Sequence, residues 1–280
     1  MKLLNILAIS AVVGGASFTV QAAKVLVVLS DASELELKNG RSIPTGFYFN
    51  ELMQPVKMLL DAGHTLTFAT PLGRAPTMDQ GSFDKSYFGG SNEALNDHKV
   101  LMDRLKITSL TDSPVVSLSR IEHVGYAQFD ALYVPGGRAP LQDLATDTSM
   151  GKLLTHFHQS GKPTALVCHG PVALLSTLPD APAFVAQLET AKDKPPLTGW
   201  IYAGYKMTVM NNTEEKLAQR RLQGGEMKYM PQTAFEQAGG DYTSSLVPFS
   251  PYVVSDRELI TGQNPASSIR VAEELLKRLQ

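Results

Sequence analysis

The chain contains a single cysteine, Cys168, among its 280 residues. One cysteine cannot form a disulfide within the chain, so the fold depends on its apolar core even in an oxidising compartment. Beyond the N-terminal segment, no apolar run is long enough to cross a bilayer. The chain also lacks a basic block, and 25 Lys and Arg stand against 27 Asp and Glu. These absences argue against nucleic acid or an anionic membrane surface as a partner.

Histidine is absent after residue 169, although the chain has six histidines. A glutamine amidotransferase of the Cys…His-x-Glu type needs a histidine well downstream of its cysteine, so that activity is excluded. His156 and His158 are two residues apart and would face different sides of a helix, which makes them a poor metal pair. We therefore expect no metal site.

Residues 1–22 have the pattern of a secretory signal peptide. Lys2 is followed by an apolar stretch that runs to Val20, and small residues precede the expected cleavage site after Ala22. The alternative is an uncleaved membrane anchor. With cleavage, residues 23–280 would form one α/β domain that works in the periplasm or outside the cell.

The remaining pattern predicts a mostly parallel sheet. A β-branched run at 24–29, an amphipathic segment at 46–61 and a second strand at 64–69 form a βαβ unit. We expect further strands at 130–134, 164–167 and 205–210, a hairpin at 252–261, and helices around 153–159 and 268–279. Two polar or irregular segments, 83–110 and 181–199, are predicted to be insertions, the first weakly helical.

Cys168 follows the short strand predicted at 164–167 and precedes Pro171, a residue suited to a first helical turn. A cysteine in such a strand-to-helix turn has the position of a nucleophile elbow. The positive end of the following helix would favour its thiolate. The alternative is an inert, buried small side chain.

Three acidic residues are candidate partners of this thiol. His169 is adjacent to it and needs an acid to orient its ring, for which Glu215 is preferred over Glu214; both open a predicted helix, where carboxylates also serve as capping groups. Pro55 cannot donate to the carbonyl of Glu51, which places Glu51 at a helix entry or kink. A buried Glu51 would have a raised pKa and could carry protons, whereas a solvated one would not.

The glycine pair Gly136–Gly137 follows the strand predicted at 130–134. A glycine backbone there could bring an N–H close to a reacting oxygen, although an ordinary turn is the simpler interpretation.

Three ordered motifs resemble the ThiJ/PfpI superfamily of class I glutamine amidotransferase-like proteins, and within it the chaperone-glyoxalase (glyoxalase III) branch. The motifs are Tyr133-Val134-Pro135-Gly136-Gly137, Val167-Cys168-His169-Gly170-Pro171 and the segment from Leu259 to Ser268. The resemblance implies a flavodoxin-like three-layer α/β sandwich with inserted capping segments, and a homodimer. It implies catalytic roles for Cys168, His169, Glu51 and Glu215, and oxyanion or substrate contacts from Gly136, Gly137, Arg138 and Gly170.

The activity that this resemblance implies is cofactor-free conversion of methylglyoxal-type 2-oxoaldehydes to 2-hydroxy acids through a cysteine hemithioacetal. Arg138 stands where the glyoxalase branch commonly has histidine and resembles the PfpI peptidase branch, so an amidohydrolase, peptidase or deglycase remains an alternative. A holdase chaperone or a thiol redox sensor in the periplasm is a further one.

Overall fold

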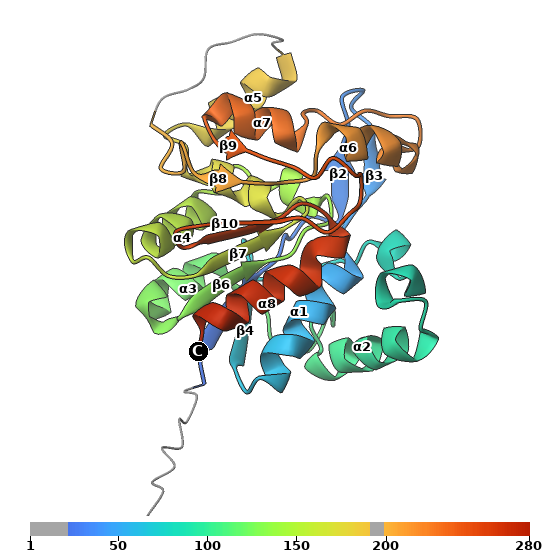
Figure 1. Ribbon diagram of the computed structural model, residues 1–280, viewed down its shortest axis with the longest axis vertical. Helices are drawn as coiled ribbons and strands as arrows, with labels where there is room; N and C mark the ends of the chain where they lie inside the picture. Colours follow the sequence, from blue (N-terminus) through green and yellow to red (C-terminus); the bar gives the residue numbers. More distant parts are fainter. Residues whose placement is uncertain (1–21, 191–198) are drawn as a thin grey trace, which may run out of the picture.

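The computed structural model describes residues 22–190 and 199–280 (Figure 1). The predicted signal peptide, apart from its last residue, and most of the second half of the insertion predicted at 181–199 lie outside the described residues. None of the helices in the described ranges has the length and hydrophobicity that a membrane span requires.

A seven-stranded sheet in the order β10–β11–β7–β6–β1–β4–β5 forms the centre of the fold. Its strands are β1 (Lys24–Val28), β4 (Thr65–Thr70), β5 (Val116–Ser117), β6 (Ala131–Val134), β7 (Thr164–Val167), β10 (Val253–Asp256) and β11 (Leu259–Gly262). All neighbours pair in parallel except β10 and β11, which form the predicted hairpin. The five inner strands have the flavodoxin order, in which ligands bind beyond the carboxyl ends of the strands.

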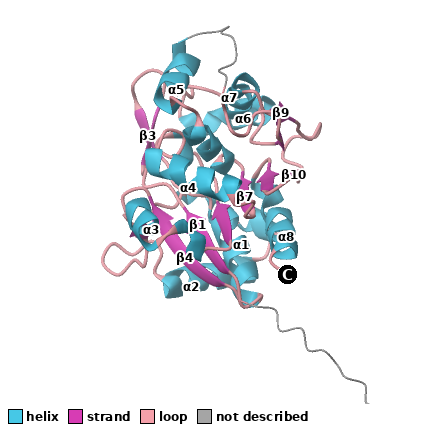
Figure 2. Cartoon of the chain, turned by 90° about the vertical axis from the view of Figure 1, so that its left-hand side faces the viewer, coloured by secondary structure: helices cyan, strands magenta, loops and turns pink. Residues whose placement is uncertain are grey.

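Alternate residues of β1 enter two separate cores, one on each face of the sheet. Val25 and Val27 pack with α1 (Phe49–Asp61), α2 (Asn92–Leu105) and α8 (Ser268–Arg278). Leu26 and Val28 pack on the side of α3 (Leu118–Val124) and α4 (Thr148–Gln159). Figure 2 shows the sheet between these two helical layers, which confirms the predicted three-layer α/β sandwich.

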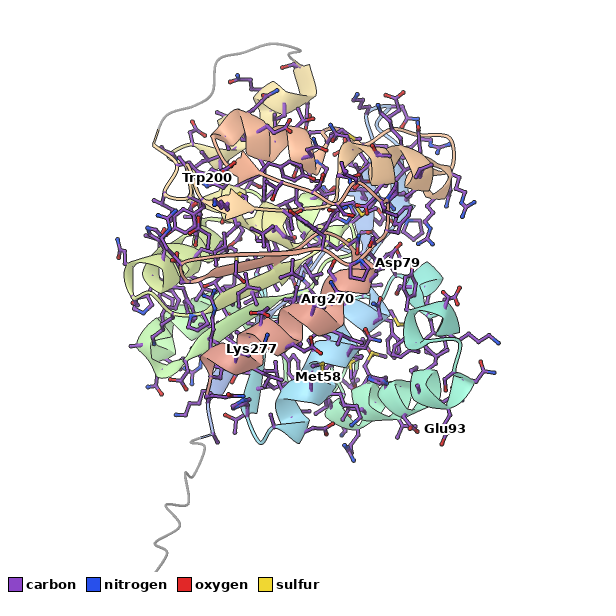
Figure 3. All side chains as sticks on the ribbon, viewed as in Figure 1. Met58, Asp79, Glu93, Trp200, Arg270 and Lys277 are labelled. Carbon is purple, nitrogen blue, oxygen red and sulfur yellow. The ribbon has the colours of Figure 1, made fainter. Side chains whose placement is uncertain are left out.

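The C-terminal helix α8 buries a stripe of apolar residues against the sheet. Val271, Ala272 and Leu275 are buried against the sheet, whereas Arg270 and Lys277 are exposed on its outer side (Figure 3). Apolar residues three and four positions apart form one stripe of a helix, which is why this helix was predictable from its sequence.

A smaller group of elements lies in the upper part of Figure 1, outside the seven-stranded sheet. It contains α5 (Ala181–Thr190), α6 (Asn212–Ala218), α7 (Pro231–Ala238), the parallel pair β8 (Lys206–Met207) and β9 (Asp241–Tyr242), and the hairpin of β2 (Glu34–Glu36) and β3 (Ser42–Pro44).

Three sequence predictions about elements differ from the structure in length or in type. The strand predicted at 205–210 is only the two-residue β8, which pairs with β9 outside the main sheet. The segment 83–110 contains α2, a regular helix of 14 residues whose Leu101 and Met102 pack on the core of α1. The helix that was predicted to begin near Pro171 is a 3₁₀ helix, Gly170–Thr177, and is buried along nearly its whole length.

Candidate active site

Cys168 occupies a sharp turn between β7 and the 3₁₀ helix that follows. Its φ angle is +60°, a left-handed conformation that is costly for a residue with a side chain. Two backbone hydrogen bonds hold the turn: the Cys168 N–H donates to Gly262 O at 2.9 Å, and Met210 N–H donates to Cys168 O at 3.1 Å. The strained turn therefore places the side chain at the end of the sheet, as a nucleophile elbow does.

His169, Glu215 and Arg138 form a buried chain of polar contacts that begins at the thiol. Cys168 Sγ lies 3.2 Å from His169 Nδ1, and His169 Nε2 pairs with Glu215 Oε1. Arg138 Nη2 donates to the other oxygen of Glu215 at 3.1 Å. Burial favours the protonated acid, yet the contacts with His169 and Arg138 outweigh it and lower the pKa of Glu215. An ionised Glu215 orients the imidazole and would stabilise its protonated form.

The structure separates the two candidate acids at the start of α6. Glu214 closes a capping box with Asn211, and its Oε1 also accepts hydrogen bonds from Phe249 N, Gln263 and Asn264. All of these contacts hold the backbone around α6. Glu215 is therefore the acid that reaches His169.

Glu51 lies in the first turn of α1 and is completely buried. Pro55 has no N–H to donate to the Glu51 carbonyl, as the sequence indicated. That carbonyl accepts a hydrogen bond from the Tyr133 hydroxyl instead. Burial raises the pKa of the Glu51 carboxyl to about 8, although contacts with Cys168 and the glycine turn lower it. The group is thus a proton carrier beside the thiol in the neutral range.

The two oxygens of this carboxyl differ in their partners. Oε2 accepts the Gly136 N–H at 2.8 Å. Oε1 is buried without a hydrogen-bond partner of good geometry among the described residues, and the Cys168 thiol is the side chain that influences the Glu51 pKa most. One oxygen is therefore fixed and the other remains available to a proton.

Close approach of the backbone explains the glycines of the site. A Cβ at Gly136 would lie 2.6 Å from Glu51 Oε2, one at Gly137 would lie 2.0 Å from Gly46 O, and one at Gly170 would lie 2.5 Å from Val134 O. The Gly136 N–H was predicted as an oxyanion donor, but it donates to Glu51. The N–H groups of His169 and Gly170 have no hydrogen-bond acceptor among the described residues, so they are the donors that remain for a reacting oxygen.

The sequence predicted that Cys168 would ionise readily to a thiolate, and the pKa of Cys168 does not agree with that prediction. Burial raises the pKa of Cys168 well above its usual value, and the neighbouring carboxylates of Glu51 and Glu215 raise it further. A 3₁₀ helix, rather than an α-helix, follows the elbow, so the expected dipole contribution is small. Because the pKa values of both Cys168 and Glu51 are raised, both groups favour their protonated forms at neutral pH.

Cys168 and His169 open into a cavity of about 440 Å³. Sequence reasoning missed most of its lining: Tyr48, Tyr87, Met210, Arg220, Arg221 and Phe249. The aromatic character of 47–49 and 83–88 was visible in the sequence, but nothing there indicated that Tyr48 and Tyr87 meet at the thiol. Arg221 follows α6 in a short turn that carries no recognisable motif.

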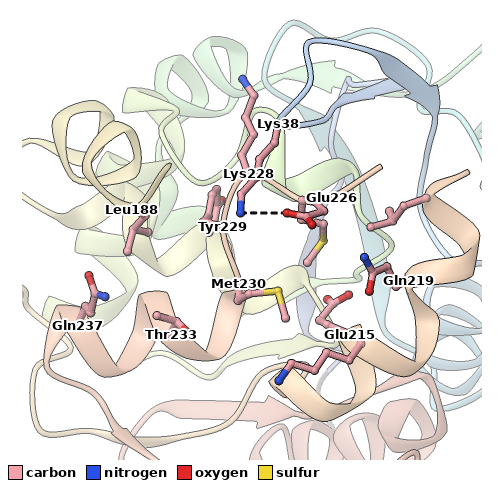
Figure 4. A pocket seen from close by; sticks show the side chains of 13 residues that line it. Lys38, Leu188, Glu215, Gln219, Glu226, Lys228, Tyr229, Met230, Thr233 and Gln237 are labelled. Atoms are coloured by element: carbon pink, nitrogen blue, oxygen red, sulfur yellow. Dashed lines mark hydrogen bonds and ion pairs between the residues drawn. The ribbon is translucent and has the colours of Figure 1, made fainter. Parts of the chain in front are cut away.

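A second cavity of about 420 Å³ lies on the other side of α6, between that helix, α7 and the segment 226–230 (Figure 4). Glu215 lines it, together with exposed charges such as the Lys38–Glu226 ion pair at 3.4 Å. Neither Cys168 nor His169 reaches it. The nucleophile and its proton partners therefore assign the chemistry to the first cavity.

A metal centre has no donor set in the described part of the chain: no three His, Cys, Asp or Glu side chains there are grouped as ligands.

Comparison with known proteins places this site in context. A model of the DJ-1/PfpI family matches residues 42–178, which include Glu51, the glycine pair and the elbow. A glutathione-independent glyoxalase of Schizosaccharomyces pombe is 26% identical over 83% of this chain and 87% of its own length. The glutamine amidotransferase-like class 1 domain-containing protein 1 of Bos taurus is 29% identical over 78% of this chain and 82% of its own.

Solved structures share the fold. The rapid encystment protein of 24 kDa from Francisella tularensis superposes with a TM-score of 0.69 at 21% identity, over 92% of this chain and 99% of its own. Glyoxalase III from Candida albicans superposes with a TM-score of 0.68 at 19% identity, over 92% of this chain and 98% of its own.

Proposed function

We propose that this chain, which a model of the DJ-1/PfpI family matches over residues 42–178, is a cofactor-independent glyoxalase III-like enzyme that converts methylglyoxal-type 2-oxoaldehydes to 2-hydroxy acids. The names of full-length relatives support this proposal, among them the Schizosaccharomyces pombe glyoxalase. The observation that carries it is the buried Glu51 carboxyl beside the Cys168 thiol, with a pKa raised to about 8 by burial. Isomerising a hemithioacetal requires such a proton carrier next to the nucleophile.

The first step forms the bond between sulfur and substrate. Cys168 Sγ attacks the aldehyde carbon, and its proton passes to Glu51 or His169, which returns a proton to the aldehyde oxygen. The product is a hemithioacetal. The N–H groups of His169 and Gly170 stabilise the charge that develops on that oxygen.

The second step moves hydrogen between neighbouring carbons. Glu51 removes the proton from the carbon bonded to sulfur, and a proton is returned to the adjacent carbonyl carbon through an enediol. The first carbon is oxidised and the second is reduced, so no external oxidant is needed. Water then cleaves the resulting thioester, which releases the 2-hydroxy acid and restores the thiol.

Turnover of methylglyoxal without glutathione tests the proposal. We expect lactate formation by residues 23–280, loss of it in Cys168→Ala, and a fall of roughly 100-fold or more in Glu51→Gln. Circular dichroism and thermal unfolding establish that both variants are folded. Equal lactate formation by wild type and Cys168→Ala would exclude a cysteine-dependent glyoxalase.

Amide or peptide hydrolysis is the second candidate, because a thiol, an adjacent imidazole and an orienting carboxylate also suit acyl transfer. In that reaction Glu51 has no carbon-bound proton to move. Hydrolysis of a peptide library that is abolished in Cys168→Ala but retained in Glu51→Gln would favour it over the glyoxalase.

A further inference from the structure

The cavity at Cys168 is cationic, although the whole chain has a net charge of −2. Three arginines line it, Arg138, Arg220 and Arg221, and no aspartate or glutamate is among its lining residues in the described chain. A concave site lined by one sign of charge raises the local concentration of ligands of the opposite sign. A neutral aldehyde such as methylglyoxal makes no use of this charge.

Arg221 is the arginine best placed to meet a ligand. Its Nη1 donates to the Tyr48 hydroxyl, and its guanidinium lies over the Tyr48 ring with Cζ 5.8 Å from the centroid. These contacts fix the direction of the side chain without neutralising it. In residues 22–190 and 199–280, Arg138 has an ion pair with Glu215, whereas neither Arg220 nor Arg221 has one.

An adjoining cavity of about 490 Å³ shares Arg138 and Arg221 with the first. Two buried polar atoms at this boundary have no hydrogen-bond partner among the described residues: Arg138 Nε and Thr45 Oγ1. Arg138 and Thr45 are 5% and 3% exposed, so water does not readily replace the missing partner. Unpaired buried polar groups of this kind call for an explanation, and Arg138, which lines both cavities, would gain a partner from a ligand oxygen there.

Asp79 is the acidic residue that lines the adjoining cavity. Its carboxylate accepts the Gly81 N–H at 2.9 Å. Burial raises the pKa of Asp79 even though Arg221 and Arg138 lower it. Within the described ranges Asp79 forms no ion pair with either arginine, and the guanidinium groups keep hydrogen-bond donors for a ligand.

We propose that the natural substrate is a 2-oxoaldehyde with an anionic group, a carboxylate or a phosphate ester, at the end away from its aldehyde. Arg221 and Arg138 Nε bind the anion while Cys168 meets the aldehyde. Tyr87 lines the same cavity as Arg221 and Cys168. The inference rests on the proposed glyoxalase function and names its substrate class.

A matched pair of substrates tests this directly. γ,δ-Dioxovalerate is a 2-oxoaldehyde with a terminal carboxylate, and its methyl ester has the same reacting groups without the charge. The enzyme would convert the first to 2-hydroxyglutarate by the internal oxidation and reduction described above. We expect a kcat/KM roughly 10- to 100-fold higher for the carboxylate, because a charged hydrogen bond is worth about 1.5–3 kcal/mol. That preference should weaken as salt is added.

Substitutions of Arg221 test whether this residue binds the anionic group of the substrate. Arg221→Gln should raise KM for γ,δ-dioxovalerate roughly 10-fold or more and should lower kcat/KM for the methyl ester much less, while Arg221→Lys should recover part of the loss. Arg120→Gln, an exposed substitution on α3 with the same charge change, is the control and should leave both substrates unaffected. Stronger competition by phosphate than by acetate would identify a phosphate ester, and the reverse a carboxylate.

The outcomes separate the two proposals. If wild type turns over both substrates equally, or if Arg221→Gln affects both equally, the anionic substrate is excluded while the glyoxalase remains. If neither substrate nor methylglyoxal reacts in a Cys168-dependent manner, the proposed function itself fails.

Discussion

Glu51 is a carboxyl group that water cannot reach, and the cost of that burial makes the stability of the protein depend on pH. Its pKa is about 8 in the folded chain and close to 4.5 when solvated. Between these two values the folded protein holds a proton that the unfolded chain has released, so stability falls as pH rises through this range, by up to about 1.4 kcal/mol per pH unit.

Replacing Glu51 by glutamine should remove that dependence. The amide oxygen can still accept the Gly136 N–H and carries no charge to desolvate. We expect the free energy of unfolding of Glu51→Gln, relative to wild type, to improve steadily from about pH 5 to about pH 8. Urea denaturation at several pH values measures it. A difference that does not change with pH would mean that Glu51 is not buried as described.

The same proton sets the pH range of activity. The Cys168–Glu51 pair that holds one proton can supply both a base and an acid, whereas the pair that holds two protons has no base. Because Glu51 has the lower pKa of the two, about 8, the singly protonated pair forms as pH rises through about 8. The kcat/KM of wild type should therefore rise with pH through this range. A profile that is flat or falls through about pH 8 would assign the limiting proton to another group.

Glu215 joins catalysis to stability, because it is the partner of both His169 and Arg138. Glu215→Gln should lower kcat by roughly 100- to 10,000-fold, through loss of the imidazole orientation. It should also cost about 3–5 kcal/mol of stability, since Arg138 is left buried and unpaired.

Glu226→Gln is the control for this substitution. Its ion pair with Lys38 is exposed, so the free energy of unfolding should change by less than about 1 kcal/mol. Equal effects of the two substitutions would show that burial does not distinguish these ion pairs.

The turn after β6 positions the site through close packing of backbone. Gly137 and Gly40 both have positive φ, but a Cβ at Gly137 would lie 2.0 Å from Gly46 O, while one at Gly40 would meet nothing within 4 Å. Gly40→Ala therefore measures the conformational cost alone, about 1 kcal/mol. Gly137→Ala should cost at least roughly 3 kcal/mol and reduce activity, because the turn that carries Gly136 must move. Thermal unfolding of the two variants compares them, and equal losses would contradict the packing described.

Helices and strands could be predicted where a local pattern of apolar residues is enough to determine them. The strands β1, β6 and β7 are continuous apolar runs, and α8 has a clear apolar stripe, so their sequences alone indicate buried strands and an amphipathic helix. The two-residue β8 exists through its pairing with β9, farther along the chain, and the run Gly170–Thr177 is buried on nearly all sides, so it has no polar face that would reveal its helix type. Local periodicity cannot indicate either of them.

The same division applies to the candidate site. Cys168, His169 and the glycine pair were found because each follows a short apolar run that indicates a strand, and Gly or Pro beside them indicates a turn. Glu51 was found from Pro55, four residues later. Arg221 and Tyr87 were missed because their place at the thiol results from the packing of segments 83–110 and 219–222 around it, which no single segment encodes.

For the whole molecule, the first described residues bear on where the protein works. The Ala23 N–H donates to His64 Nδ1 at 3.1 Å, and Ala23 O accepts Thr65 N–H at 2.9 Å. A chain that begins at Ala23 keeps both contacts, since its α-amino group can donate in place of the amide. Cleavage after Ala22 is therefore compatible with the fold. Burial of Cys168, which is 2% exposed, also limits disulfide formation between copies in an oxidising compartment.

We predict that a bacterial host exports this chain to the periplasm and releases it with Ala23 as its first residue. Osmotic-shock fractionation and intact-mass measurement of the released protein test both parts. Lys2→Glu together with Leu7→Arg should abolish export, because the charge and the apolar run of the segment are both disrupted. Export of that variant, or recovery of the full-length chain in the membrane fraction, would contradict the prediction and favour an uncleaved anchor.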